Sequence, residues 1–297
     1  MEKDKEMVYN EAISRLLGAL DEDRVAIKNS LLDSYLGKPV SIEMEEEIYK
    51  YFFTHSVVST ATMANPGTSL ITEFLYEGPL SSFFPIDDYF LQSKGGSAIK
   101  ERLLAVRDNL PKIIEEYRSK GSVLIGNFGS GPGRDVIDIF SDLYKDSLNV
   151  KAIHIDRDSA ALKRGKRMAK IKKVDHLIAF IEGNFLKQKL NKKFDIVLLV
   201  GVLCGLKSEV CIRILKSIRK FIKKGGTIIA SNVSKEMLEE DPFTCFLMEW
   251  VGNWKLVFKD ERELRKIFEK AGYKWKGSFT DPQGFHTVGI GTPRSYF

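Results

Sequence analysis

The second half of the chain alternates short apolar runs with helical stretches, and this alternation limits the fold more than any other feature. Five runs rich in β-branched residues are VLIGNF, VKAIHID, LIAFIEGN, FDIVLLVG and GTIIASN. Strands that alternate with helices are typical of a parallel α/β sheet. Two further runs, KWKGSFT and FHTVGIG, are separated only by DPQG, which predicts an antiparallel hairpin at one edge. We therefore predict a mostly parallel sheet of seven strands.

The first half of the chain has a helical pattern instead. Its apolar residues recur every three or four positions, as in Ile13, Leu16, Leu17 and Leu20 and again in Ile99, Leu103, Val106, Leu110, Ile113 and Ile114. We predict an all-helical cap domain over residues 1–118 and an α/β domain over residues 119–297. The segment from Phe74 to Phe90 is rich in aromatic residues. We expect it to form a lid over the carboxyl edge of the sheet, because a reaction site benefits from excluding water.

Composition excludes several classes of protein. The 297 residues are 43% hydrophobic with a net charge of +6, and the terminal MEKDKEMVYNEA lacks the apolar core of a secretory signal. The longest apolar stretch, FDIVLLVGVLCGL, is too short to span a bilayer, so we predict a cytoplasmic protein without a membrane span. Cys204, Cys211 and Cys245 lack a C-x-x-C spacing, which predicts neither disulfides nor a metal site.

Three glycines occupy every second position directly after the first predicted strand, at Gly129, Gly131 and Gly133. Glycine is used where φ is positive or where a ligand must approach the main chain closely. A dinucleotide fingerprint, G-x-G-x-x-G, would need its third glycine at position 134, which holds Arg134. The pattern therefore favours a ligand site but argues against a nicotinamide cofactor.

The G-x-G-x-G pattern and the ends of the next two strands together resemble motif I and its partners in class I S-adenosylmethionine-dependent methyltransferases. This resemblance implies a Rossmann-like sheet and S-adenosylmethionine as cofactor. It also implies that Asp156 accepts hydrogen bonds from the ribose hydroxyls, and that Asn184 and Phe185 contact adenine. The alternatives are that Asp156 caps the next helix and that Asn184 lies in a turn. The candidate cofactor-binding residues are Asn127, Gly129, Ser130, Gly131, Gly133, Asp156, Arg157, Asn184, Phe185 and Gly201.

A second resemblance covers residues Gly95 to Gly291. The stretches GSAIKERLLAVRDNLPKIIEEYRSKG, FLMEWVGNWKLVFKDERELRKIFEKAGY and DPQGFHTVGIG are similar to the bacterial extracellular-factor methyltransferases, which make 3-hydroxy fatty-acid methyl esters. The resemblance implies a small or medium apolar acceptor, such as a hydroxy fatty acid, methylated on its carboxylate. The chain departs from that family in the apolar VLCG after the fourth predicted strand and in residues 1–94.

Candidate acceptor-site residues lie after the fourth and fifth predicted strands and in the hairpin. Glu249 and His286 are the candidate catalytic residues, and Trp250, Trp254 and Cys204 are candidates for substrate binding. We expect the two tryptophans, four residues apart, to share one helix face. The alternatives are that both tryptophans are core residues, that Glu249 is a surface residue, and that His286 is structural. A carboxylate acceptor is ionised at neutral pH, so it requires no general base.

Other acceptors have less support. GVLCGL lacks the Asn/Asp-Pro-Pro-aromatic sequence expected for amide or base N-methylation, and the apolar neighbours of Cys204 suggest an inert thiol. The run KRGKRMAKIKK is compatible with RNA, anionic lipid or an acidic carrier protein, but also with a solvated helix face. We predict a small-molecule substrate and no DNA or RNA partner. The alternatives are an RNA or protein methyltransferase and a cofactor-binding sensor without activity. No feature indicates an oligomeric state.

Overall fold

The computed structural model describes residues 14–16, 18, 20, 24–77, 84–119 and 121–294. The chain forms two compact units. The helical unit consists of Met1–Lys100 and Lys235–Leu256, and the sheet unit consists of Glu101–Ser234 and Val257–Phe297. The units divide within the long helix α7 (Lys94–Arg118), between Lys100 and Glu101, rather than after residue 118. The helical unit also includes Lys235–Leu256, which the sequence analysis assigned to the α/β domain.

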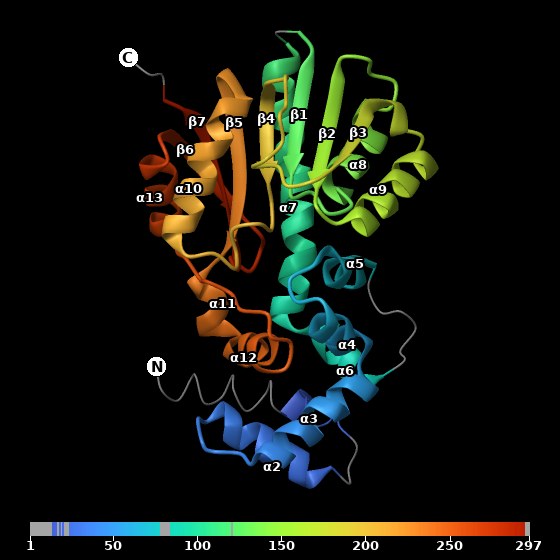
Figure 1. The fold of residues 1–297 in the computed structure, drawn as a ribbon, viewed down its shortest axis with the longest axis vertical. Coiled ribbons are helices and arrows are strands. Elements are labelled where there is room, and N and C mark those ends of the chain that lie inside the picture. The colour runs from blue at the N-terminus through green and yellow to red at the C-terminus, as the bar shows by residue number, and fades with distance from the viewer. Residues whose placement is uncertain are drawn as a thin grey trace. The chain divides into compact units, whose positions relative to one another are not determined.

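The sheet unit is built on seven strands in the order β3-β2-β1-β4-β5-β7-β6 (Figure 1). They are β1 (Val123–Phe128), β2 (Val150–Asp156), β3 (Ile178–Glu182), β4 (Phe194–Leu199), β5 (Ile222–Val233), β6 (Tyr273–Thr280) and β7 (His286–Pro293). The pairs among β1 to β5 are parallel, whereas β7 pairs antiparallel with both β5 and β6. The predicted fold, including the antiparallel hairpin at one edge, is therefore confirmed.

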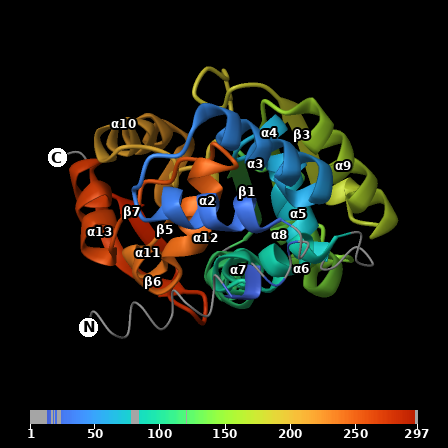
Figure 2. The same cartoon turned by 90° about the horizontal axis from the view of Figure 1, so that it is seen from below.

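Helices cover both faces of this sheet. They are α8 (Arg134–Ile139), which continues into a π-helical turn (Phe140–Tyr144), α9 (Ser159–Ile171), α10 (Ser208–Ile218) and α13 (Glu261–Lys270), with 3-10 turns at Asp175–Leu177 and Arg219–Phe221. Val123 and Ile125 of β1 pack with α7, α8 and α9, whereas Phe128 belongs to a second cluster with α10 and α13. This alternation is that of a strand buried on both faces. Figure 2 looks along the strands and shows α8 and α10 on opposite sides of the sheet.

The helical unit combines two separate stretches of the chain. Its helices are α2 (Val25–Tyr35), α3 (Ile42–His55), α4 (Val57–Ala64), α5 (Ser69–Glu77), α6 (Pro85–Gln92), the first residues of α7, α11 (Lys235–Glu240) and α12 (Pro242–Trp250). Phe52 and Ile48 of α3 share a core with Phe243 and Leu247 of α12. Because this core needs both stretches, the helices before residue 100 do not fill it alone.

Parts of two sequence expectations lie outside the described residues. The predicted helical stripe includes Ile13 and Leu17, which the structure does not describe. The predicted lid segment from Phe74 to Phe90 begins within α5 and ends within α6, and residues 78–83 between these helices are outside the described residues. Among the residues that are described, no helix has both the length and the apolar character needed to cross a bilayer.

Candidate cofactor and catalytic site

The glycine loop between β1 and α8 uses the conformations that only glycine adopts easily. Gly129, Gly131 and Gly133 have φ values of 65°, 54° and 76°. A Cβ atom at Gly129 would lie 2.6 Å from Cγ2 of Val202, and one at Gly133 would overlap the buried ring of His154. The alternating glycines therefore provide the left-handed backbone inferred from the sequence, and two of them also make room for the side chains of Val202 and His154.

Asp156, at the end of β2, is tied to this loop. Its carboxylate accepts hydrogen bonds from the backbone N–H of Gly131 at 2.7 Å and from that of Asp158 at 2.8 Å. A carboxylate has about four acceptor positions, so two remain for hydroxyl groups of a ligand. The cap of α9 is Asp158, whose side chain accepts from Ala160 and Ala161, and the neighbouring Arg157 is exposed. Asp156 thus fits the ribose role better than the capping role.

The chain after β3 brings an aromatic ring to the same loop. Phe185 stacks on Phe128, the last residue of β1, with ring centroids 5.6 Å apart and an interplanar angle of 24°. A Cβ atom at Gly129 would be 3.7 Å from Phe185, beside Val202. Asn184 is exposed, and its side-chain oxygen accepts from the N–H of Leu186 at 2.9 Å, which is the turn geometry considered as an alternative. Val202 is the member of this apolar corner that the sequence analysis missed.

Polar side chains replace apolar ones on the opposite face of β1 near its carboxyl end. The amide of Asn127 donates to Asp135 at 3.2 Å, and both residues are buried. Burial raises the pKa of Asp135 to about 6, an effect partly offset by hydrogen bonds from Val136 and Asn127 and by the charge of Arg102. Asp135, in the first turn of α8, is therefore a buried carboxyl group whose ionisation burial disfavours.

Arg102 of α7 was not predicted from the sequence, although it lies on the apolar stripe between Ile99 and Val106. It is 6% exposed, and its guanidinium nitrogens lie 3.8 and 3.9 Å from the position of a Cβ atom on Gly201. Gly201, the predicted residue after β4, has a φ of 79° and donates its N–H to Ser231 Oγ at 2.8 Å. A buried cation thus lies between the ends of β1 and β4, where open α/β sheets bind ligands.

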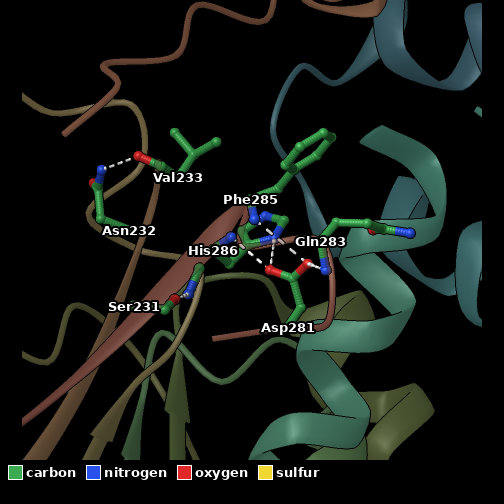
Figure 3. A network of polar contacts seen from close by, with 8 residues as sticks. Ser231, Asn232, Val233, Asp281, Gln283, Phe285 and His286 are labelled. Carbon is green, nitrogen blue, oxygen red and sulfur yellow. Dashed lines mark hydrogen bonds and ion pairs between the residues drawn. The ribbon is translucent and has the colours of Figure 1, made fainter. Parts of the chain in front are cut away.

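His286 begins β7 beside this polar region (Figure 3). It is 4% exposed, and desolvation lowers its pKa to about 4, so the ring is neutral at pH 7. Its Nδ1 lies 3.5 Å from Asp281, whose carboxylate accepts from the N–H of His286 at 2.6 Å and from that of Gln283 at 3.1 Å. The turn between β6 and β7 therefore fixes the backbone at the start of β7 and places a carboxylate beside a neutral imidazole, whose lowered pKa makes it a weak base.

The remaining candidates are distributed over both units. Cys204 is a buried thiol of the sheet unit. Glu249, Trp250 and Trp254 belong to the helical unit, where Glu249 is exposed and Trp250 stacks on Phe246 at 5.4 Å. The expectation that the two tryptophans share a helix face is wrong. The helix α12 ends at Trp250, and the chain then turns through Asn253, which has a φ of 47°.

A seven-stranded sheet of this order, with a glycine loop after β1 and an acidic residue ending β2, defines a class I methyltransferase fold. A family model described as a methyltransferase domain matches residues 122–272, just over half of the chain. The chain belongs to this methyltransferase-domain family, and its cofactor is S-adenosylmethionine.

Solved structures share the fold at low sequence identity. A possible exported protein from Bordetella parapertussis has a TM-score of 0.66 and 14% identity, with 99% of this chain and 97% of that chain covered. Magnesium protoporphyrin IX methyltransferase from Synechocystis, solved with bound SAH, has a TM-score of 0.55 and 12% identity, covering 84% and 99%. A putative O-methyltransferase from Nostoc punctiforme has a TM-score of 0.52 and 17% identity, covering 82% and 71%. No curated protein matches the sequence.

Proposed function

We propose that the protein transfers the methyl group of S-adenosylmethionine to an oxygen atom of a small or medium apolar acid, such as the carboxylate of a hydroxy fatty acid. The observation that carries this proposal is an apolar pocket inside the helical unit. The likeness of Gly95 to Gly291 to the extracellular-factor methyltransferases supports the same acceptor class.

The pocket occupies about 480 Å³ of space that includes open solvent. Its walls come from α4, α5, α6, α7 and α12 and from the chain that follows α12. None of its lining side chains is charged, and the large ones include Ile71, Leu75, Ile99, Leu247 and Trp254. Each methylene group buried there contributes about 0.8 kcal/mol, so an aliphatic chain is the occupant that the lining favours.

Glycines let the walls come close together. A Cβ atom at Gly95 would be 3.0 Å from Cγ2 of Thr244, and one at Gly252 would be 2.5 Å from Cγ2 of Thr62. Trp254 lies over Gly67, since a Cβ atom on Gly67 would be 3.0 Å from Nε1 of Trp254. Trp254 is part of the lining, which supports a role in substrate binding, whereas Trp250 packs against Phe246 and is not in the lining.

Two buried hydroxyl groups of the lining, those of Ser59 and Thr244, have no hydrogen-bond partner among the described residues. Ser59 is 3% exposed, and its Oγ forms no hydrogen bond with any residue that the structure describes. Thr62 and Ser93, by contrast, donate to the carbonyls of Val58 and Phe90 at 2.7 and 2.9 Å. An unpartnered buried hydroxyl costs about 1 to 3 kcal/mol, and a polar group on the ligand would remove that cost. This arrangement supports a hydroxy acid over a plain hydrocarbon chain.

The chemistry needs little from the protein beyond alignment. S-adenosylmethionine, when bound, supplies a methyl group on a positively charged sulfur, and the acceptor oxygen displaces that sulfur. Holding two partners in line contributes roughly 7 to 11 kcal/mol. A carboxylate is already ionised at pH 7, so its methylation needs no general base. Burial lowers the pKa of His286 to about 4, which makes its ring a weak base for a hydroxyl acceptor and favours the carboxylate.

The test measures transfer of labelled methyl groups to a series of fatty acids and hydroxy fatty acids, with tRNA and a peptide pool in parallel. We expect KM to fall with chain length until the pocket is full, and Trp254→Ala to raise KM steeply. Ser59→Ala should reduce the preference for the hydroxylated acid while leaving the plain acid unaffected. Val25→Ala, at an exposed position of α2, is the control for side-chain truncation outside the pocket.

Three results would contradict the proposal. Label that enters only tRNA or peptide identifies a different acceptor class. Cofactor binding without transfer to any acceptor supports the sensor alternative. If the Ser59→Ala variant keeps the ratio of kcat/KM for hydroxylated and plain acids, the pocket does not read a hydroxyl group.

A further inference from the structure

The helix α9 presents a row of cations on one face. Lys163, Lys166, Arg167 and Lys170 are exposed and follow the i, i+3, i+4, i+7 spacing, which places them on one side of a helix. The opposite side is buried and consists of Ala161, Leu162, Gly165 and Ala169. We call the four cations the α9 stripe. Its position is that of the basic run seen in the sequence.

The α9 stripe is not neutralised locally. The helix contains no acidic residue, and none of the four cations forms an ion pair within the part of the chain that the structure describes. Lys172, just beyond the helix, does have such a partner, Asp138 at 2.8 Å. Like charges at i+3 and i+4 destabilise a helix, so the stripe is maintained against a local cost. An anionic partner would remove that cost.

The wider surroundings are also basic. Residues 159–193 contain eleven Lys and Arg but two Asp and Glu, although the net charge of the whole chain is +6. The positive charge is therefore concentrated in this segment rather than spread evenly. Local concentration of one sign of charge attracts a surface of the opposite sign.

An exposed apolar residue beside the α9 stripe distinguishes among anionic partners. Ile171, the last residue of α9, is 79% exposed. Binding of single-stranded nucleic acid relies on aromatic side chains that stack on bases, and α9 has no aromatic residue. Clusters of four or more Lys and Arg on an amphipathic helix are instead typical of recognition of anionic lipid.

We propose that the α9 stripe docks the protein onto an anionic lipid bilayer. Lys163, Lys166 and Arg167 face the headgroup phosphates with Lys170, and Ile171 lies at the boundary with the acyl chains. This binding goes beyond the proposed function and does not depend on it. Docking would bring the protein to the membrane, where an apolar acceptor is concentrated.

The test is sedimentation with vesicles of phosphatidylcholine alone or mixed with phosphatidylglycerol. We expect binding to the mixed vesicles only, and weaker binding as salt rises, because exposed charges are screened. The stripe variant changes Lys163, Lys166, Arg167 and Lys170 to Glu, and it should bind at least tenfold more weakly. The matched control changes four exposed cations elsewhere in the sheet unit to Glu, namely Arg262, Lys266, Lys270 and Lys274, and should lose less than threefold.

Further variants keep the proposal falsifiable. Ile171→Asp should weaken binding more than Ile171→Ala, and all variants should still bind S-adenosylmethionine if they are folded. The proposal is overturned if the wild type does not sediment with the mixed vesicles, or if the stripe and control variants lose binding equally. Preferential stripe-dependent binding of homopolymeric RNA would also overturn it. Methyl transfer to a soluble acceptor without vesicles tests the proposed function separately.

Discussion

The contact between the glycine loop and β2 predicts a large cost for one added methyl group. Gly133 and Gly225 have nearly identical φ values, 76° and 77°, and both belong to the sheet unit. They differ in their surroundings. A Cβ atom at Gly133 would overlap the ring of His154, which is completely buried, whereas one at Gly225 would have no atom within 4 Å. Gly225→Ala is therefore a matched control for Gly133→Ala.

The two substitutions share the backbone cost but not the steric cost. A left-handed conformation costs a non-glycine residue about 1 to 2 kcal/mol, which applies to both variants. Overpacking of a buried site costs about 1 to 3 kcal/mol more, and this applies only at Gly133. We therefore expect Gly133→Ala to lower the free energy of unfolding by about 2 to 5 kcal/mol and Gly225→Ala by about 1 to 2 kcal/mol.

Urea denaturation measures both values, and a double-mutant cycle identifies the clash. Combining Gly133→Ala with His154→Ala removes the ring that the new methyl group meets, so the two changes should cost less together than the sum of their separate effects. Coupling of about 1 to 3 kcal/mol is expected for residues in contact. Equal costs for Gly133→Ala and Gly225→Ala, or additivity in the cycle, would refute the reasoning.

Three further predictions concern the cofactor and pH. Gly131→Val and Asp156→Ala should each weaken S-adenosylmethionine binding at least tenfold in calorimetry, and unchanged affinity would exclude their predicted roles. Burial lowers the pKa of His154 to about 3, so the unfolded chain binds a proton first as pH falls below 6.5. This difference should lower the free energy of unfolding by about 2 kcal/mol at pH 5 relative to pH 7. His154→Gln should remove that contribution to the pH dependence, as measured by urea titrations at the two pH values. The raised pKa of Asp135 works in the opposite direction, because the folded state keeps its proton up to about pH 6 and loses stability as pH rises from 3.8. Asp135→Asn should thus stabilise the protein at pH 8 by about 1 to 3 kcal/mol, and a destabilised variant would contradict this.

The sheet was predictable from the sequence because its signals are local. Each β-branched run became a strand, and the short DPQG gave the antiparallel pair β6 and β7. Boundaries were less predictable. The fifth run, GTIIASN, begins at Gly226, whereas β5 starts at Ile222 and includes Gly225 and Gly226. Glycine disfavours strands locally, and pairing with β4 and β7 overrides that preference.

The candidate site was predictable only where a required backbone conformation restricts the type of residue. The glycine loop was predictable because its three left-handed positions favour glycine. Arg102 was not predictable, because its position in the site depends on elements that are distant in the chain. The unpartnered hydroxyl of Ser59 and the turn after Trp250 are likewise products of tertiary packing. Sequence periodicity suggested one helix face for Trp250 and Trp254, but it does not show where a helix ends.

The discontinuous helical unit has a consequence for synthesis of the protein. Its first 100 residues leave the ribosome long before Lys235–Leu256, which supplies Phe243 and Leu247 to the shared core. At elongation rates of roughly 5 to 20 residues per second this delay is roughly 7 to 30 s. During that interval the early helices expose the apolar surface that α12 later covers. Nascent chains stalled before residue 235 should therefore be engaged by chaperones, and chains stalled well beyond residue 256 should be released from them.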